Sequence, residues 1–207
     1  RRQRQMCIRD SEFSAGRVQQ PVRQMVPIPG HDAIIAAMPA VGEAMAVKVV
    51  TLYHENAGTE TPTHQAVILL FDKANGSPLA TMDGRLITEM RTAAMSAAAA
   101  RALAKPQCAV ATIMGSGVQA HAHFEALSRV RDVAEWRVWA RTPERGQALA
   151  ERIGARFVAD PETAVRGADI VACTTAATEP VLFGDWLEPG AFVTAVGWNG
   201  HDGRELD

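Results

Sequence analysis

The stretch Val110-Ala111-Thr112-Ile113-Met114-Gly115-Ser116-Gly117-Val118-Gln119-Ala120 decides the fold of the second half of this chain. A β-branched apolar run ends in the pattern G-x-G-x-x-A, and an amphipathic segment follows. In this pattern the first glycine permits a tight turn, the second lets a pyrophosphate approach the backbone, and the small third residue lets helix and sheet pack closely. The helix N-terminus adds free N–H groups and partial positive charge. The pattern predicts a dinucleotide-binding loop, against the alternative of a purely structural turn; its residues are Gly115, Gly117, Val118, Gln119 and Ala120.

The residues after the next predicted strand, Trp136–Ala140, indicate which dinucleotide is bound. An NAD site has Asp or Glu at this strand end for the ribose 2′-hydroxyl, whereas an NADP site has Arg. Here Arg141 and Thr142 follow the strand, and Glu144 belongs to the next predicted helix. A guanidinium offers a phosphate two parallel N–H donors. The sequence favours NADP(H), with NAD(H) as the alternative and a solvated arginine as the simplest interpretation.

Composition narrows the class of protein. The 207 residues are 47% hydrophobic and 21% charged, which is typical of one large or two small globular domains. The formal charge is −2 with basic residues scattered, so nucleic acid is not an expected partner. No apolar run reaches about 18 residues, so no membrane span is expected. Cys108 and Cys173 lie in apolar, strand-like segments without CxxC spacing, which predicts reduced thiols in the cytoplasm rather than a disulfide or a metal site.

Both ends of the chain are predicted to be incomplete. Residues 1–11 lack periodicity, and Met6-Cys7-Ile8-Arg9-Asp10-Ser11 resembles a sequencing adapter translated in frame, which predicts a non-native segment. The alternative is a basic N-terminal arm. At the other end, Gly203–Asp207 has the pattern of a helix start, and a dinucleotide domain that stopped there would lack at least its last strand.

The hydrophobic pattern divides the chain into two halves. Residues 12–105 contain β runs separated by turn signals, among which Asn75-Gly76 predicts a hairpin. An alanine-rich helix over Thr88–Leu103 then leads to residues 106–207, where strands and helices alternate. The predicted β runs of the first half are Val18–Pro27, Ile34–Met38, Val47–Tyr53, Ala66–Phe71 and Leu79–Met82. The prediction is an α/β chain in which a mainly antiparallel β domain precedes a C-terminally truncated Rossmann-type domain with a parallel sheet.

Seven further segments of the chain are informative together: Gln20-Pro21-Val22-Arg23, Val47–Thr51, Pro62–Phe71, Met82-Asp83-Gly84, Arg91–Ala94, Ala177–Pro180 and Ala195-Val196-Gly197. With the glycine loop, these stretches resemble the ornithine cyclodeaminase/mu-crystallin family, and within it the mu-crystallin-like ketimine reductases. The similarity covers nearly everything from Gly16 to Asp207 and is far more specific than the glycine loop alone.

The resemblance implies NADPH-dependent reduction of a cyclic ketimine carboxylate, of pyrroline- or piperideine-2-carboxylate type, to a cyclic amino acid. It also implies that residues 12–105 form a substrate-binding and dimerisation domain, residues 106–207 bind the cofactor, and the protein is a homodimer. Two alternatives remain open: an ornithine cyclodeaminase or amino-acid dehydrogenase using NAD, and an NADP-regulated small-ligand-binding protein of mu-crystallin type.

The resemblance assigns the substrate site to the first domain. Arg23 matches an arginine that holds the substrate carboxylate, and Lys48 matches a lysine beside the reacting carbon, so both are candidate catalytic residues. Thr63 and His64 match a stretch near the substrate or cofactor. The competing interpretations are a solvent-facing arginine, an edge-strand lysine and a structural histidine.

The resemblance assigns further residues to the cofactor. Arg91 and Thr92, placed in the first turn of the alanine-rich helix, are expected to hold a cofactor phosphate, and the alternative is a surface arginine paired with Glu89. Residues that follow predicted strands are expected around the ribose and nicotinamide, because open α/β sheets bind ligands at the carboxyl ends of their strands. These residues are Thr174, Thr175, Ala176, Val196 and Gly197.

One departure from the family separates the candidate reactions. Cyclodeaminases carry an aspartate shortly after the Val-Gly pair, and here the matching residue is Asn199. An amide cannot act as a base, which weakens the cyclodeaminase alternative and favours imine reduction. His121 and His123 lie two apart on a predicted helix and so face different directions, which predicts structural roles and no metal site.

Overall fold

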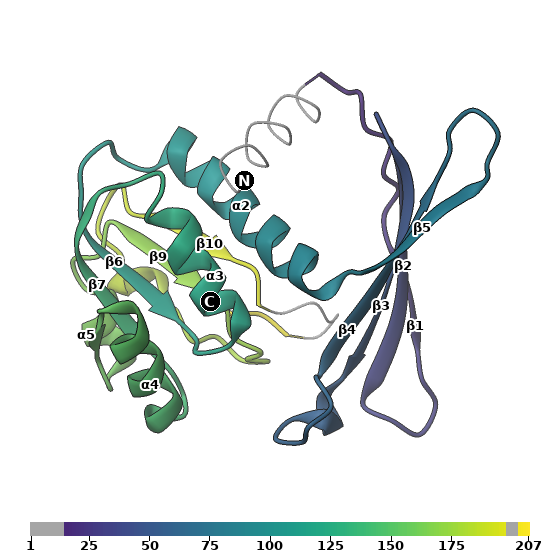
Figure 1. The fold of residues 1–207 in the computed structure, drawn as a ribbon. Coiled ribbons are helices and arrows are strands. Elements are labelled where there is room, and N and C mark those ends of the chain that lie inside the picture. The colour runs from purple at the N-terminus through teal and green to yellow at the C-terminus, as the bar shows by residue number, and fades with distance from the viewer. Residues whose placement is uncertain (1–14, 198–202) are drawn as a thin grey trace. The chain divides into compact units, whose positions relative to one another are not determined.

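The structure is a computed structural model that describes residues 15–197 and 203–207, so the adapter-like segment 1–11 lies outside the described residues. Contacts between Cα atoms divide the chain after Thr88 into two compact units. The first unit ends at Thr88 and the second runs from Glu89 to Asp207 (Figure 1).

The first unit is a five-stranded antiparallel sheet in which neighbours in sequence are neighbours in space, in the order β1-β2-β3-β4-β5. The predicted hairpin at Asn75-Gly76 is confirmed, because β4 and β5 pair antiparallel across it. Gly76 has φ +78°, a left-handed conformation that favours glycine, and its N–H donates to the Asp72 carbonyl. The strands are β1 (Gln24–Pro27), β2 (Ala33–Val41), β3 (Met45–Tyr53), β4 (His64–Phe71) and β5 (Pro78–Asp83).

The first strand is shorter than the sequence predicts. Of the expected run Val18–Pro27, only Gln24–Pro27 joins the sheet, and Gln19 makes an isolated bridge to Val41. Pro21 lies between the two, and proline has no N–H to donate to a ladder. The interruption leaves Arg23 one residue before β1 rather than inside it.

The second unit contains a parallel sheet in the order β10-β9-β6-β7-β8. Helices alternate with most of these strands, as the sequence predicts (Figure 1). The strands are β6 (Cys108–Met114), β7 (Val133–Trp139), β8 (Arg156–Phe157), β9 (Ile170–Cys173) and β10 (Phe192–Ala195). The helices are α2 (Arg85–Leu103, which begins in the first unit), α3 (Val118–Leu127), α4 (Pro143–Ile153) and α5 (Pro161–Val165).

The sheet of the second unit has a hydrophobic cluster on each face. On one face, residues of α2, α3 and α4 pack on Ala111, Ile113 and Ala172. On the other, Val165 of α5 packs with Met114, Val171 and Cys173. The small residues of α2 that enter the first cluster are Ala93, Ala94, Ala97 and Ala100. Because these alanines belong to the parallel-sheet core, the compact units divide at Thr88, whereas the predicted domain boundary after residue 105 remains a prediction.

The last described residues differ from the sequence prediction. Gly203–Asp207 is not helical; Leu206 forms a parallel bridge with Leu182. The N–H groups of Val181 and Leu182 donate to the Glu205 carbonyl. The segment is extended because its backbone forms hydrogen bonds with the chain that follows β9 instead of the internal hydrogen bonds of a helix.

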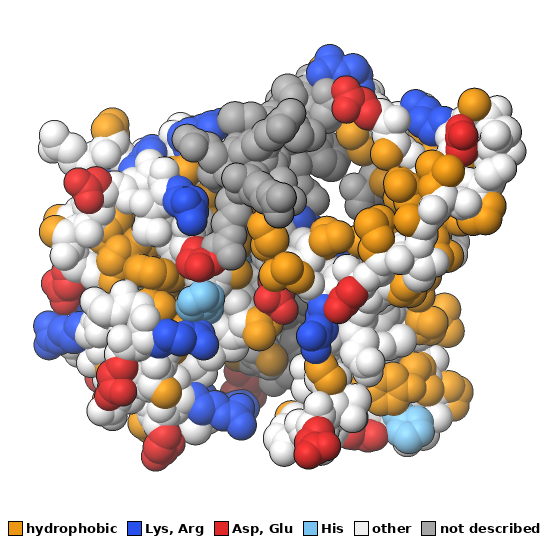
Figure 2. Space-filling model, viewed as in Figure 1, with side chains coloured by type: hydrophobic (Ala, Val, Ile, Leu, Met, Phe, Trp, Pro, Cys, Tyr) orange, Lys and Arg blue, Asp and Glu red, His pale blue; other side chains and the backbone are white. Residues whose placement is uncertain are grey.

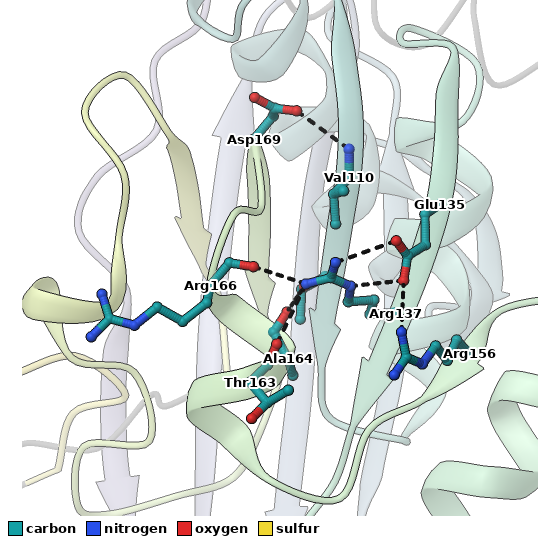
Figure 3. A network of polar contacts seen from close by, with 9 residues as sticks. Val110, Glu135, Arg137, Arg156, Thr163, Ala164, Arg166 and Asp169 are labelled. Atoms are coloured by element: carbon teal, nitrogen blue, oxygen red, sulfur yellow. Dashed lines mark hydrogen bonds and ion pairs between the residues drawn. The ribbon is translucent and has the colours of Figure 1, made fainter.

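A polar network on β7 fixes α5 against the sheet (Figure 3). The Arg137 guanidinium makes an ion pair with Glu135 at 2.9 Å and donates to the Arg166 carbonyl at 2.8 Å. It also donates to the carbonyls of Thr163 and Ala164 at 3.4 and 3.5 Å. One mostly buried side chain thus supplies donors to carbonyl groups at the end of α5.

Replacing Arg137 with methionine is expected to lower the free energy of unfolding by about 1–2 kcal/mol, because Glu135 and the carbonyls at the end of α5 lose their charged donor. Urea denaturation measures the loss. Arg129→Met removes an exposed arginine and is the control; equal stability of the two variants would contradict the assignment.

Candidate functional site

The predicted dinucleotide loop lies at the point where the parallel sheet reverses its strand order. β6 is paired with β7 on one side and β9 on the other, so the connections leave it in opposite directions. Gly115 follows β6 and Thr174 follows β9, at the same carboxyl edge of the sheet. In open α/β sheets, ligands bind at the carboxyl edge of the strands, at the point where the strand order reverses.

Glycine is present at the two loop positions, 115 and 117, for different reasons. Gly115 has φ +125°, and a Cβ there would lie 2.6 Å from the Thr174 hydroxyl oxygen, so both conformation and space require glycine. Gly117 has an ordinary extended backbone, and a Cβ there would meet nothing within 4 Å. The fold therefore does not need the second glycine. The open space above it and the N-terminus of α3 fit a phosphate that approaches the backbone.

The residues predicted to choose between NAD and NADP lie at the end of the neighbouring strand. Arg141 and Thr142 follow β7, and both are exposed. Thr142 is the N-cap of α4, but its side chain makes no capping hydrogen bond, so the structure leaves the hydroxyl available to a ligand. Arg141, Thr142 and the N-terminus of α4 thus offer a cation, a hydroxyl and free N–H groups to an anion.

The remaining predicted cofactor residues of this sheet follow β9 and β10. Thr174 is buried and bonds through both N–H and hydroxyl to the Met114 carbonyl, whereas Thr175 and Gly197 are half-buried. Gly197 follows Val196, whose N–H donates to the Cys173 carbonyl. The structure therefore brings all the strand-end residues of the prediction to one edge of one sheet.

Sequence reasoning missed Glu205, which bonds to two of these residues. Its carboxylate accepts hydrogen bonds from the Thr175 N–H and hydroxyl, both at 2.6 Å, and from the Gly197 N–H at 2.8 Å. Its side chain is buried, with the residue 4% exposed. The only signal in the sequence was a carboxylate near the end of the chain, within the segment predicted to begin a helix.

Cys173, at the end of β9, is not a nucleophile. Burial, with a smaller contribution from the Glu205 carboxylate, holds the pKa of its thiol far above the ordinary value. A reactive cysteine needs a lowered pKa and access to solvent. Cys108 and Cys173 are both buried and free.

A second set of hydrogen-bonded polar side chains, which is largely buried, was also not predicted from the sequence. His123 of α3 is fully buried and bonds to Ser96 of α2 at 2.9 Å, and Ser96 bonds to Thr194 of β10 at 2.9 Å. His123 Nδ1 lies 2.7 Å from the Gln119 carbonyl, so Nδ1 carries the proton and Nε2 accepts from Ser96. The predicted structural role of His123 agrees with this geometry. In the described part of the chain, no group of three or more His, Cys, Asp or Glu is arranged to hold a metal ion.

Burial lowers the pKa of His123 below its ordinary value of 6.5. As the pH falls below about 6.5, the unfolded chain takes up a proton that the folded protein does not, so stability is lost by at most about 1.4 kcal/mol per pH unit. Comparing urea midpoints at about pH 7.5 and about pH 5.5 measures this loss. His123→Gln is expected to flatten it, and an unchanged slope would assign the loss to other groups.

The predicted substrate residues lie in the first unit. Lys48 is on β3, the central strand, opposite Met38 of β2 and Ile68 of β4. The alternative of an edge-strand lysine is therefore wrong. Its half-buried ammonium donates to the Thr88 hydroxyl at 3.3 Å, and that hydroxyl donates to the Gly84 carbonyl at 2.7 Å. A cation in an apolar sheet is costly unless it is paired or functional.

Arg23 and His64 share the sheet face of Lys48. Extending the β1–β2 register by one residue places Arg23 opposite Met38, which is also opposite Lys48. Arg23 and Lys48 thus belong to one cross-strand row, two strands and about 10 Å apart at their Cα atoms. His64 begins β4 opposite Leu52, which alternation places on the same face as Lys48. Thr63 precedes it, and the Thr63 carbonyl accepts from the Tyr53 N–H.

A surface cavity of about 470 Å³ lies against β4 and β5 in the same unit. Gln65, Val67, Thr81 and Asp83 line it from the face opposite Lys48, and Ala66 and Met82, which share the Lys48 face by register, also line it. Neither Arg23 nor Lys48 is among its lining residues.

The structure corrects one argument about Arg91. The alanine-rich helix begins at Arg85 rather than Thr88, so Arg91 and Thr92 lie in its second turn instead of its first. The helix dipole acts mainly on the first turn, so the dipole gives no reason to expect a bound anion next to Arg91. Both side chains are half-buried, and their contact with a cofactor phosphate remains a prediction.

Two further points concern Asn199 and membrane-spanning helices. Asn199, the residue that separates reductase from cyclodeaminase chemistry, lies outside the described residues, so its role also remains a prediction. Within the described part of the chain, none of the helices combines the length and apolarity needed to cross a bilayer.

Comparisons with known proteins extend these observations. The model of the ornithine cyclodeaminase/mu-crystallin family matches residues 9–207. Ketimine reductase mu-crystallin of Mus musculus is 44% identical over 197 residues, which cover 93% of this chain and 63% of the mouse protein. Delta(1)-pyrroline-2-carboxylate reductase of Bacillus cereus is 37% identical over 195 residues, covering 90% of this chain and 60% of that protein. The chain thus spans somewhat under two thirds of the length of these relatives.

Solved structures with the same fold include two dinucleotide complexes. Thermococcus litoralis Delta(1)-pyrroline-2-carboxylate reductase, in complex with NADH and L-proline, superimposes with a TM-score of 0.92 at 35% identity, covering 99% of this chain and 66% of that one. An archaeal alanine dehydrogenase dimer with bound NAD has a TM-score of 0.92 at 28% identity, covering 100% of this chain and 66% of that one. Both the antiparallel and the parallel sheet therefore belong to a known fold.

Proposed function

We propose that this chain, which belongs to the ornithine cyclodeaminase/mu-crystallin family, carries the substrate and cofactor residues of an NADPH-dependent reductase of cyclic ketimine carboxylates. The product is a cyclic amino acid of the proline or pipecolate type. The feature that carries the proposal is the pair Arg23 and Lys48: Lys48 lies on a largely apolar sheet face, and extending the β1–β2 register by one residue places Arg23 in the same row. The names of the mouse and Bacillus cereus relatives support the reaction class.

The two cations have separate tasks in this proposal. The Arg23 guanidinium binds the substrate carboxylate, for which its planar pair of donors is suited. The Lys48 ammonium, which donates to the Thr88 hydroxyl, supplies a proton to the imine nitrogen. Thr63 and His64 complete the substrate side. Half-burial of Lys48 strengthens its interaction with the developing charge, because the surroundings screen it less than water does.

The second half of the chain holds the cofactor in this proposal. Bound NADP(H) supplies the hydride for the C=N carbon. Gly117 and the N-terminus of α3 accept the pyrophosphate, and Arg141 with Thr142 holds the 2′-phosphate. The strand-end residues Thr174, Thr175, Ala176, Val196 and Gly197 surround the ribose and nicotinamide, and Arg91 with Thr92 contacts a phosphate. We accordingly assign residues 12–105 to substrate binding and dimerisation and residues 106–207 to cofactor binding.

We further propose a homodimer formed through the antiparallel sheet. Hydrophobic side chains gather over this sheet in Figure 2. Val26, Ile35 and Val41 are 57%, 39% and 38% exposed, and their register places them on the face opposite Lys48. A second copy on that face would bury them and leave the Lys48 face to the substrate. The free, buried cysteines Cys108 and Cys173 support a reducing location such as the cytoplasm.

A paired assay on the full-length protein tests the proposed reaction. NADPH oxidation is measured with a five- or six-membered cyclic ketimine carboxylate, and ammonia release is measured with ornithine. We expect NADPH to be consumed with the imine and no ammonia to be released. Ammonia release from ornithine without imine reduction would establish the cyclodeaminase alternative.

Assays on the same full-length protein distinguish two other functions. An amino-acid dehydrogenase would reduce NAD with an open-chain amino acid and would not reduce the cyclic imine. An NADP-regulated binding protein of mu-crystallin type would turn over none of these compounds and bind an apolar carboxylate ligand only when NADPH is present. Asn199, an amide where the cyclodeaminases have an aspartate, favours the reductase over the cyclodeaminase.

A further inference from the structure

Glu205 is a buried carboxylate that serves two neighbouring loops. It is 4% exposed, and its Oε1 accepts from both the N–H and the hydroxyl of Thr175 at 2.6 Å. Its Oε2 accepts from the Gly197 N–H at 2.8 Å. Three donors on one carboxylate fix the positions of both of its oxygens. Glu205 therefore joins the chain after β9 to the chain after β10.

The backbone around Glu205 holds the carboxylate in this position. The Glu205 carbonyl accepts from the N–H groups of Val181 and Leu182 at 2.9 and 3.1 Å, and the Asp207 carboxylate accepts from the Gly184 N–H at 2.9 Å. Leu206 is half-buried and forms a parallel bridge with Leu182, which adds a strand-like contact. The carboxylate is thus presented by an anchored segment rather than by a free tail.

The two loops that Glu205 joins approach each other very closely. A Cβ on Gly197 would lie 1.8 Å from the Thr175 carbonyl oxygen and 2.5 Å from Glu205 Oε1, so no other residue fits there. Thr175 and Gly197 follow adjacent parallel strands, at the edge where open α/β sheets bind their ligands. One carboxylate thus links both loops at this edge.

We infer that Glu205 is a positioning residue for the nicotinamide half of the cofactor site, an inference that depends on the proposed function. Its carboxylate holds the backbones of Thr175 and Gly197 in the arrangement that receives the nicotinamide and its ribose. Glu205 itself is covered by these loops and touches no ligand. A purely structural carboxylate would stabilise the fold without favouring one half of the cofactor over the other.

The test compares whole cofactor with half cofactor in the full-length protein. NADPH contains the nicotinamide, whereas 2′,5′-ADP contains only the adenosine half, which the proposed function places at Arg141. Glu205→Gln keeps the size of the side chain but leaves only one acceptor oxygen, so the bonds to Thr175 and Gly197 cannot both persist. We expect the Kd for NADPH to rise about tenfold and the Kd for 2′,5′-ADP to stay within about twofold. Glu188→Gln removes an exposed carboxylate and is the matched control.

Each outcome has one meaning. Equal weakening of NADPH and 2′,5′-ADP, or no weakening of either, overturns the positioning role while leaving the proposed function intact. If the parent protein shows no measurable binding of either 2′,5′-ADP or NADPH, the proposed function itself is contradicted. If Glu205→Gln does not fold, Glu205→Asp keeps the charge and shortens the reach. We expect it to weaken NADPH about threefold with 2′,5′-ADP unchanged, and parental affinity for NADPH would overturn the inference.

Discussion

Replacing Lys48 with methionine is expected to lower kcat for imine reduction about 1000-fold, because the proton donor beside the substrate nitrogen is removed. The Kd for NADPH is expected to stay within about twofold, since the lysine is assigned to the substrate and not to the cofactor. Methionine matches the length of the lysine stem and suits the row between Met38 and Ile68. Steady-state kinetics and NADPH fluorescence titration on the full-length protein measure the two quantities.

Lys73→Met is the matched control for this substitution. Lys73 lies in the loop between β4 and β5, is exposed, and donates to the Gly42 carbonyl at 2.5 Å. It carries the same charge and sits on the same sheet, so we expect its removal to leave kcat unchanged. A Lys48→Met protein that retains parental kcat would show that Lys48 only supports the sheet. A protein that loses NADPH affinity as well would place the lysine at the cofactor.

Most of the fold could be predicted from local pattern. The β-branched run before Gly115, the alternation after residue 106 and the Asn75-Gly76 turn each depend on neighbouring residues, and each is confirmed. The errors occur where distant contacts override the local signal. Pro21 stops the first strand early, and the segment Gly203–Asp207 gives up a helix to bond with residues 178–184.

The candidate site was predictable to the extent that its residues follow strands. Parallel strands bring their carboxyl ends to one edge, so the loops after β6, β7, β9 and β10 had to meet. The partners that fix those loops could not be predicted. Glu205 contacts Thr175, 30 residues away, and Ser96 contacts Thr194, 98 residues away. The local sequence pattern around such a side chain does not indicate which distant residue it will contact.

Replacing Arg141 with aspartate is expected to change the ratio of NADPH to NADH affinity by about 1000-fold, towards NADH. Arg141 follows β7 at the position that binds the ribose 2′ substituent, and it is exposed at the N-terminus of α4. Loss of a charge-assisted pair of hydrogen bonds weakens the 2′-phosphate complex, and the new carboxylate repels the phosphate and accepts from the 2′-hydroxyl of NADH. Fluorescence titration with both cofactors measures the ratio.

Arg152→Asp separates this local effect from a change in net charge. Arg152 lies in the last turn of α4 and is exposed, so it makes the same change of charge on the same helix at the opposite end. Surface charges more than a Debye length away are largely screened at physiological salt, so this control is expected to keep the parental ratio. A parent protein that binds NADH and NADPH equally, or a control that shifts as far as Arg141→Asp, would contradict the assignment of the 2′-phosphate to Arg141. A shift confined to Arg141→Asp would place the adenosine end of the cofactor after β7 and therefore its nicotinamide end towards β9 and β10, since the glycine loop after β6 lies between them.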